Sequence, residues 1–316
     1  DAGFFFMSAD VSGVSTRSLP GLAFDYLVIP GLGVFPFPTG QIVEYQDTIF
    51  DIEEQNYALF GNLGWEVCDG LELKFGMRLD LAEREINRVR RVGEERLDVR
   101  KPATYTNIAP EFGFEWECCD WVTFHGKTGL AFKPGGFSAY SDLAEEAQFD
   151  TESIWANEIG VRLDPWGGKL WLGVTAFWNE IQDYQVERSV TFGEYVVINA
   201  PEVTARGVEV ELVARPFEGF AIGGNFGLTQ AQFDDYRDPY PQIDATGAII
   251  PGAPRRDYTG NEVPFVPAWT ASAFASYRHA CGAFARVEGT FVGDTFYDEL
   301  NSPYFRQSSY GLLGAS

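Results

Sequence analysis

Residues 235–264 bring together side chains of the kind that hold a small ligand. The candidate ligand-binding residues are Tyr236, Tyr240, Arg255, Arg256 and Tyr258. Tyrosine rings offer π faces, and guanidinium groups stack on aromatic groups and form paired hydrogen bonds to anions. We therefore expect this segment to bind an anionic or aryl chelate. The charge runs at 82–104 and 139–153 are interpreted instead as solvated surface.

Metal chemistry and enzyme catalysis receive little support from the sequence. The four cysteines show no C-x-x-C spacing, and the chain has two histidines. His125 and His279 both lie close to predicted short turns, whereas a nucleophile–histidine pair needs its imidazole beside the reacting groups. We predict no metal site, no cofactor and no enzymatic activity.

The stretch "ARGVEVELVARPFEGF" (205–220) alternates between apolar and acidic residues. Val208 and Val210 would share one face of a strand, while Glu209 and Glu211 would point to the other face. A soluble antiparallel sheet alternates in this way with its polar face in water. A transmembrane barrel does so with its apolar face in lipid. This strand alone leaves both alternatives open.

The composition narrows the classes of protein. The 316 residues carry a formal net charge of −23, and 16% of them are aromatic. We do not expect so acidic a chain to bind nucleic acid, which requires clustered lysine and arginine. The sequence has no run of about 18 apolar residues that could cross a bilayer as a helix. Barrel strands would escape this test because they show only alternation.

Short turn signals alternate with long polar segments along the chain. The turns lie at 67–70, 118–121, 164–168, 216–219 and 279–282. The long segments, interpreted as irregular loops, are 14–54, 82–104, 134–153, 184–201, 235–264 and 298–308. A transmembrane barrel has short turns at one end and long loops at the other. We therefore predict an all-β, transmembrane antiparallel β-barrel, with about twelve strands in this chain.

Alternation also assigns side chains to the two faces of the predicted wall. The residues expected to face the lumen are Lys74, Arg78, Glu111, Glu115, Lys127, Glu209 and Glu211. The residues expected to face lipid are Leu73, Phe75, Phe112, Phe114, Val208 and Val210. A slip of one residue in strand register would exchange the two sets, so this assignment is a strict test of the fold.

Tryptophans fall near the ends of the predicted strands. Those within about five residues of the short turns, close enough for an interfacial girdle, are Trp65, Trp116, Trp121, Trp166 and Trp171. Those at the loop-side ends are Trp155, Trp178 and Trp269. Transmembrane barrels carry aromatic girdles at both membrane interfaces, so this placement favours the barrel over a soluble sandwich.

Four phrases, in this order, resemble one protein family. They are "YALFGNLGWEVCDGLELKFGMRLD" (57–80), "GLAFKPGGFSAYS" (129–141), "NEIGVRLDPWGGKLWLGVTAFWNEIQDYQV" (157–186) and "NAPEVTARGVEVEL" (199–212). Together they are similar to the TonB-dependent outer-membrane receptors of the iron-complex type. The resemblance is strong from about residue 55 to 234 and weaker to 316.

The resemblance implies a 22-strand barrel closed by a plug domain, in the outer membrane of a Gram-negative type of cell. Residues 1–316 would then form part of the barrel, without the plug, the final strands or the N-terminal segment that engages TonB. The implied function is energised uptake of a ferric siderophore, with TonB and membrane lipid as partners. Cobalamin, haem or oligosaccharide would fit the same mechanism. A passive porin, a barrel enzyme and a soluble lectin-like sheet are the other classes considered.

The cysteines test the predicted topology. Cys68, Cys118, Cys119 and Cys281 all fall in or beside short turns, so we expect them at one rim of the barrel. By the usual spacing of strands, Cys281 would lie about six strands beyond Cys118, or about 29 Å around the wall, far beyond the reach of a disulfide. We expect Cys281 to be unpaired.

Overall fold

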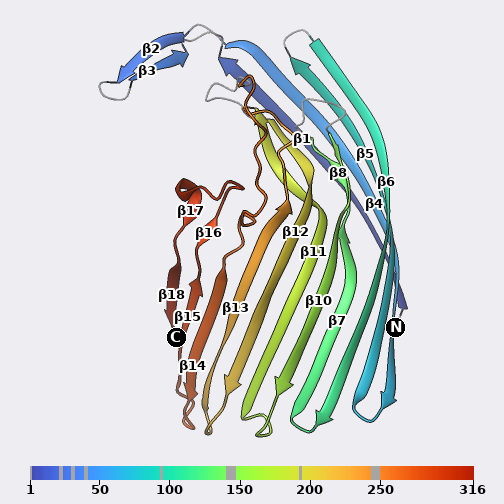
Figure 1. Cartoon of the computed structure of the whole chain (residues 1–316), viewed down its shortest axis with the longest axis vertical. Helices are drawn as coiled ribbons and strands as arrows, with labels where there is room; N and C mark the ends of the chain where they lie inside the picture. Colours follow the sequence, from blue (N-terminus) through green and yellow to red (C-terminus); the bar gives the residue numbers. More distant parts are fainter. Residues whose placement is uncertain are drawn as a thin grey trace.

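The computed structural model describes residues 2–20, 24–29, 33–38, 42–92, 95–139, 147–191, 194–242 and 250–316. One antiparallel sheet of twelve strands dominates the chain and curves like part of a barrel wall (Figure 1). Its strands, in spatial order, are β1 (Ala2–Pro20), β4 (Ile42–Cys68), β5 (Leu71–Val92), β6 (Glu95–Cys119), β7 (Val122–Lys133), β10 (Glu152–Leu163), β11 (Leu170–Thr191), β12 (Glu194–Ala214), β13 (Phe220–Asp235), β14 (Trp269–Arg278), β15 (Phe284–Val292) and β18 (Tyr310–Ala315). The predicted all-β antiparallel fold with about twelve strands is confirmed.

Within the described ranges, three two-stranded sheets lie outside this wall. They pair β2 (Phe24–Ile29) with β3 (Gly33–Pro38), β8 (Gly136–Phe137) with β9 (Gln148–Phe149), and β16 (Thr295–Phe296) with β17 (Arg306–Gln307). Helix in the described part of the chain is limited to one 3-10 turn, Pro303–Phe305. No described helix is long and apolar enough to cross a membrane.

The five short turns lie together at the lower end of the sheet in Figure 1, and the longer connections lie at the upper end. Glycine permits the tightest of these turns. Gly70 has φ 77°, and a Cβ there would lie 2.6 Å from the carbonyl oxygen of Glu117. Gly219 has φ 78°, and a Cβ there would overlap the carbonyl oxygen of Arg278. Any other residue would be strained at both positions.

Three of the segments interpreted as irregular loops contain long strands, and that part of the prediction is wrong. In the segments 14–54, 82–104 and 184–201, strand pairing continues almost to the tip of each connection. Charged residues on both faces conceal the alternation in these extensions. Ion pairs also link neighbouring strands there, as between Arg84 of β5 and Glu54 of β4.

The register of the sheet places alternate side chains on opposite faces. Val210 of β12 lies directly opposite Val174 and Phe226, whereas Glu209 lies opposite Thr175 and Gly227. Directly opposite residues share a face, so the apolar and acidic sets of β12 are separated across the whole wall. We call the face that carries Glu209 the inner face and the face that carries Val210 the outer face.

Tryptophans mark two levels on the outer face. Trp116 of β6 lies opposite Phe124 of β7, and Trp155 of β10 lies opposite Leu130 of the same strand. The six residue steps from Phe124 to Leu130 span about 20 Å along the strand. This separation approaches the apolar band of about 25 Å that transmembrane barrels carry.

Trp171 does not belong to this outer set, which corrects its assignment to the girdle. It alternates with Gly173 and Thr175 and therefore lies on the inner face, where it lines a small cleft together with Glu209. Its closeness to a turn could be read from the sequence, but its face depends on the position at which β11 begins.

In the part of the chain that the structure describes, two buried apolar clusters lie toward the loop end. The β5–β6 cluster consists of Phe50, Ile52, Ala82, Ile86, Ala103, Tyr105 and Phe137. The β12–β13 cluster consists of Val186, Val203, Ala231, Phe233, Tyr236, Tyr258 and Val263. Each cluster packs a strand-derived inner surface against a folded connection, which fixes these connections above the wall.

Candidate functional site

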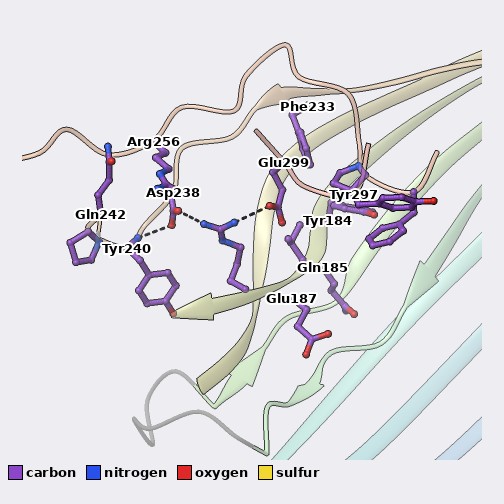
Figure 2. A pocket seen from close by; sticks show the side chains of 15 residues that line it. Tyr184, Gln185, Glu187, Phe233, Asp238, Tyr240, Gln242, Arg256, Tyr297 and Glu299 are labelled. Carbon is purple, nitrogen blue, oxygen red and sulfur yellow. Dashed lines mark hydrogen bonds and ion pairs between the residues drawn. The ribbon is translucent and has the colours of Figure 1, made fainter. Parts of the chain in front are cut away.

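A cavity of about 680 Å³ opens at the loop end of the sheet. It lies between the upper part of β11, the connection from β13 to β14 and the connection from β15 to β18 (Figure 2). The residues that line it are Tyr184, Gln185, Val186, Glu187, Arg188, Phe233, Asp238, Tyr240, Pro241, Gln242, Arg256, Pro264, Phe265, Tyr297 and Glu299. Its volume falls in the range of sites that enclose small ligands.

The connection from β13 to β14 forms one wall of this cavity by folding back on itself. The amide of Tyr258 donates to the carbonyl of Tyr236 at 2.8 Å, and the amide of Asp238 donates to the carbonyl of Arg256 at 2.9 Å. Tyr236 and Tyr258 are 1% and 0% exposed, and their ring centroids lie 4.8 Å apart. The buried tyrosines therefore anchor the connection, while Asp238, Tyr240 and Arg256 line the cavity.

Arg188 joins this connection to the other two segments that line the cavity. Its Nη1 donates to Glu299 Oε2 at 3.0 Å, and its Nη2 donates to Asp238 and to the Tyr258 hydroxyl. Figure 2 draws both ion pairs as dashed lines that meet at the guanidinium group between Asp238 and Glu299. One arginine thus holds three chain segments together.

Burial strongly affects the protonation of this cluster. Burial lowers the pKa of Arg188, but the nearby Tyr236, Tyr258, Asp238 and Glu299 outweigh it, so its pKa is raised. Burial raises the pKa of Tyr236 and of Tyr258, although Arg188 acts in the opposite direction on both. The arginine is therefore charged and both tyrosines are neutral over the physiological range of pH.

The five predicted ligand-binding residues occupy different environments. Tyr240 and Arg256 line the cavity. Tyr236 and Tyr258 are buried in the β12–β13 cluster, where they support the cavity wall without reaching its surface. Arg255 is exposed and does not line the cavity.

Several residues that line the cavity were missed by sequence reasoning. Arg188, Asp238 and Glu299 come from three separate segments, and no short-range spacing connects them. Glu187 and Arg188 lie within 184–201, which the sequence predicts to be loop. The stretch around Asp238 and Tyr240, which contains Pro239 and Pro241, was the strongest signal in the sequence for these lining residues.

The residues expected to line the lumen lie on the inner face of the sheet and are largely paired. Lys74 bonds to Glu115 at 2.7 Å, and Lys127 pairs with Glu111 at the same distance. Arg78 forms two hydrogen bonds to Asp80, each of 2.7 Å. These contacts link β5, β6 and β7 across the inner face. Whether this face lines an aqueous lumen stays a prediction.

Glu209 and Glu211 differ from that group because neither has an ion-pair or hydrogen-bond partner in the part of the chain that the structure describes. They line a cleft of about 150 Å³ together with Arg162, His125 and Trp171. This cleft, toward the short-turn end of the inner face, therefore contains two carboxylates that have no partner among the described residues. It is suited to a cationic group from outside the described residues.

The cysteines lie at the short-turn end as four exposed free thiols, with Cys281 Sγ 3.0 Å from His279 Nδ1. Cys281 is therefore unpaired, as the strand spacing predicts. Within the described ranges, no group of three or more His, Cys, Asp or Glu residues could hold a metal ion.

Residues 4–316 match the sequence model of the family described as TonB dependent receptor-like, beta-barrel. Among solved structures, the chain is similar to the ferric yersiniabactin uptake receptor FyuA from Yersinia pestis, with a TM-score of 0.67, 18% identity and coverage of 86% of this chain and 42% of that one. It is also similar to the siderophore receptor PiuA from Acinetobacter baumannii, with a TM-score of 0.62, 16% identity and coverage of 89% and 38%.

A third similar structure is the copper transporter OprC, with a TM-score of 0.62, 13% identity and coverage of 86% of this chain and 45% of that one. The chain therefore spans less than half the length of each of these proteins. At such low identities the likeness establishes the fold, and the three proteins differ in their cargo.

Proposed function

Because the chain belongs to the TonB-dependent receptor-like β-barrel family, we propose that it forms part of the wall of an outer-membrane receptor that imports an iron–siderophore complex. The observation that carries this proposal is the cavity of about 680 Å³ at the loop end of the sheet. It lies where long connections gather, and connections of this kind form ligand sites on rigid β-scaffolds.

The two faces of the sheet fit this role. The outer face carries exposed apolar side chains such as Leu63 and Ile159, at 64% and 60% exposure, which suit contact with the lipid of a Gram-negative outer membrane. The inner face carries ion pairs together with the unpartnered Glu209 and Glu211 of the described chain. We assign these two carboxylates to contact with a plug that lies inside the complete barrel.

In this proposal, the residues of the loop end have different roles in ligand binding. Tyr240 and Arg256 contact the ligand at the cavity surface. Tyr236 and Tyr258 pack behind the cavity wall and support it. Arg188 fixes the positions of the three segments relative to one another. Release into the periplasm then depends on TonB, which acts through a part of the receptor outside this sequence.

Uptake measurements on the full-length protein test the proposal. Iron-limited cells that express it should accumulate radioactive iron from a ferric siderophore, and deletion of TonB or collapse of the proton gradient should abolish this uptake. Tyr240→Ala should lower the uptake, whereas Tyr304→Ala should not, because Tyr304 is 92% exposed and lies outside the cavity. Uptake that continues without TonB would indicate a passive channel instead.

A further inference from the structure

The charges that line the loop-end cavity are unequal in number. Among the described residues, the lining carries the carboxylates of Glu187, Asp238 and Glu299 and the guanidinium groups of Arg188 and Arg256. At neutral pH the three carboxylates exceed the two cations by one negative charge. A ligand that enters the cavity therefore meets an excess of negative charge.

Arg188 is not free to attract an anionic ligand. Its side chain is 14% exposed, and its two terminal nitrogens donate to Glu299, Asp238 and the Tyr258 hydroxyl. An incoming anion could reach this guanidinium only by displacing a carboxylate from it. The displaced carboxylate would then remain buried without its counter-ion, so the exchange gives no preference for an anion.

The carboxylates of the cavity are more available than its cations. Glu187 is exposed and has no ion-pair or hydrogen-bond partner among the described residues. Glu299 engages Arg188 through Oε2, and its Oε1 accepts no hydrogen bond from the described part of the chain. Arg256 lies close enough to Tyr258 to lower the pKa of that hydroxyl, so its charge is partly directed into the wall.

Aromatic rings cover much of the remaining lining. Tyr184, Tyr240, Phe265 and Tyr297 all face the cavity, and they come from three different segments. The negative π face of such a ring attracts a cation and packs against uncharged aryl groups, but it offers nothing to a bare anion. The rings and the surplus carboxylate therefore both favour a cationic or uncharged ligand over an anion.

We propose that the loop-end cavity binds a metal chelate that is uncharged or cationic and discriminates against polyanionic chelates. This inference rests on the proposed function, in which the same cavity holds the imported ligand. It replaces the anionic part of the sequence-based expectation of an anionic or aryl chelate. That expectation counted the arginines of residues 235–264 without the carboxylates of Glu187, Asp238 and Glu299 that share the cavity.

Binding of three iron(III) complexes to the purified full-length receptor tests the proposal. The complexes are a triply negative tris-catecholate, an uncharged trihydroxamate and a trihydroxamate of similar size with one protonated amine. Tryptophan fluorescence quenching reports binding of each. We expect the cationic and uncharged complexes to bind at least tenfold more tightly than the trianion, and added salt to weaken binding of the cation.

The Glu187→Gln variant separates charge selection from mere fit. Removing this carboxylate should weaken binding of the cationic complex by about fivefold, which corresponds to about 1 kcal/mol for a charge about 8 Å away in partly wet surroundings. It should leave the uncharged complex unchanged and strengthen binding of the trianion. The matched control is Glu218→Gln in the short turn before β13, which should change none of the three affinities.

The outcomes distinguish this inference from the function on which it rests. Tightest binding of the trianion, or equal binding of all three complexes, would overturn the charge preference while leaving the receptor function intact. Failure of every complex to bind, together with absent TonB-dependent iron uptake, would overturn both.

Discussion

Arg188 and Glu299 stand 111 residues apart in the sequence, yet Nη1 of the arginine lies 3.0 Å from Oε2 of the glutamate. The same guanidinium bonds to Asp238, fifty residues away. The side chains of all three residues are between 6% and 17% exposed, so these ion pairs are poorly screened by water. The contacts close a ring of three segments around the cavity, and the shape of the cavity therefore depends on this arginine.

Removal of the Arg188 charge should open the loop end. In Arg188→Met, Asp238 and Glu299 would stay buried without a counter-ion, a defect that typically costs about 3–5 kcal/mol. Hydrogen exchange of the amides in residues 236–242 and 250–264 should then become faster by orders of magnitude. As a control, Arg96→Met breaks the exposed pair with Asp98, and water screens such exposed pairs so that they contribute little to stability. Equal exchange rates in both variants would contradict the role of Arg188.

The outer face of β12 should reject charge. Val210→Arg places a guanidinium among Val174 and Phe226, which should cost about 2–4 kcal/mol if this level of the wall lies near the centre of the bilayer. Glu209→Gln, one residue away on the inner face, should change stability by about 0.5 kcal/mol or less. Unfolding of the full-length protein in lipid vesicles by urea measures both. Comparable losses would mean that the two faces do not differ in environment.

The wall of the sheet was accessible to sequence reasoning because its rules are local. Turn residues mark where strands end, and a period of two assigns every side chain to a face. Val208 and Glu209 could be separated in this way without knowledge of their neighbours. Toward the loop end, turn residues and alternation no longer identify the strands. Strand pairing continues there with charges such as Arg84 and Glu54 on the inner face, so the polar sequence suggested loops where strands exist.

The candidate site could be predicted only in part. Tyr240 and Arg256 were identified because they lie in one short segment that is rich in aromatic and basic residues. Arg188 and Glu299 could not be, because their meeting depends on how three connections fold over the wall. Burial also divided residues of the same type, since Tyr258 faces the protein interior while Tyr240 faces the cavity. Residue type alone does not distinguish a buried tyrosine from one that faces the cavity.

The turn between β12 and β13 should depend on glycine. Gly219 has φ 78°, and a Cβ at this position would overlap the carbonyl oxygen of Arg278. Gly219→Ala should therefore lose more than the roughly 1–2 kcal/mol that a left-handed conformation alone costs. Gly168, with φ 81° and no atom within 4 Å of the place where a Cβ would lie, provides the control for conformational strain without a clash. Thermal unfolding should separate the two alanine variants, and identical melting temperatures would refute the clash.

Alkaline titration should reveal the two buried tyrosines behind the cavity. Burial raises the pKa of Tyr236 and of Tyr258, with Arg188 lowering both by a smaller amount. Between pH about 10 and the higher folded-state values, the unfolded chain releases its phenolic protons while the folded loop end retains them. The contribution of these two tyrosines to the stability of the loop end is therefore constant below pH about 10 and falls as the pH rises further through their folded-state pKa values.

Absorbance of the tyrosinate ion measures this effect directly. The folded full-length protein should show a late component that titrates above the range of the urea-unfolded chain, and Tyr236→Phe should reduce that component. Hydrogen exchange in residues 236–242 and 250–264 should accelerate over the same alkaline range, because ionisation of Tyr236 places a negative charge in an apolar cluster with Phe233 and Val263. A late component that persists unchanged in Tyr236→Phe would show that this hydroxyl already ionises with the exposed tyrosines, and the packing behind the cavity would then be looser than these contacts require.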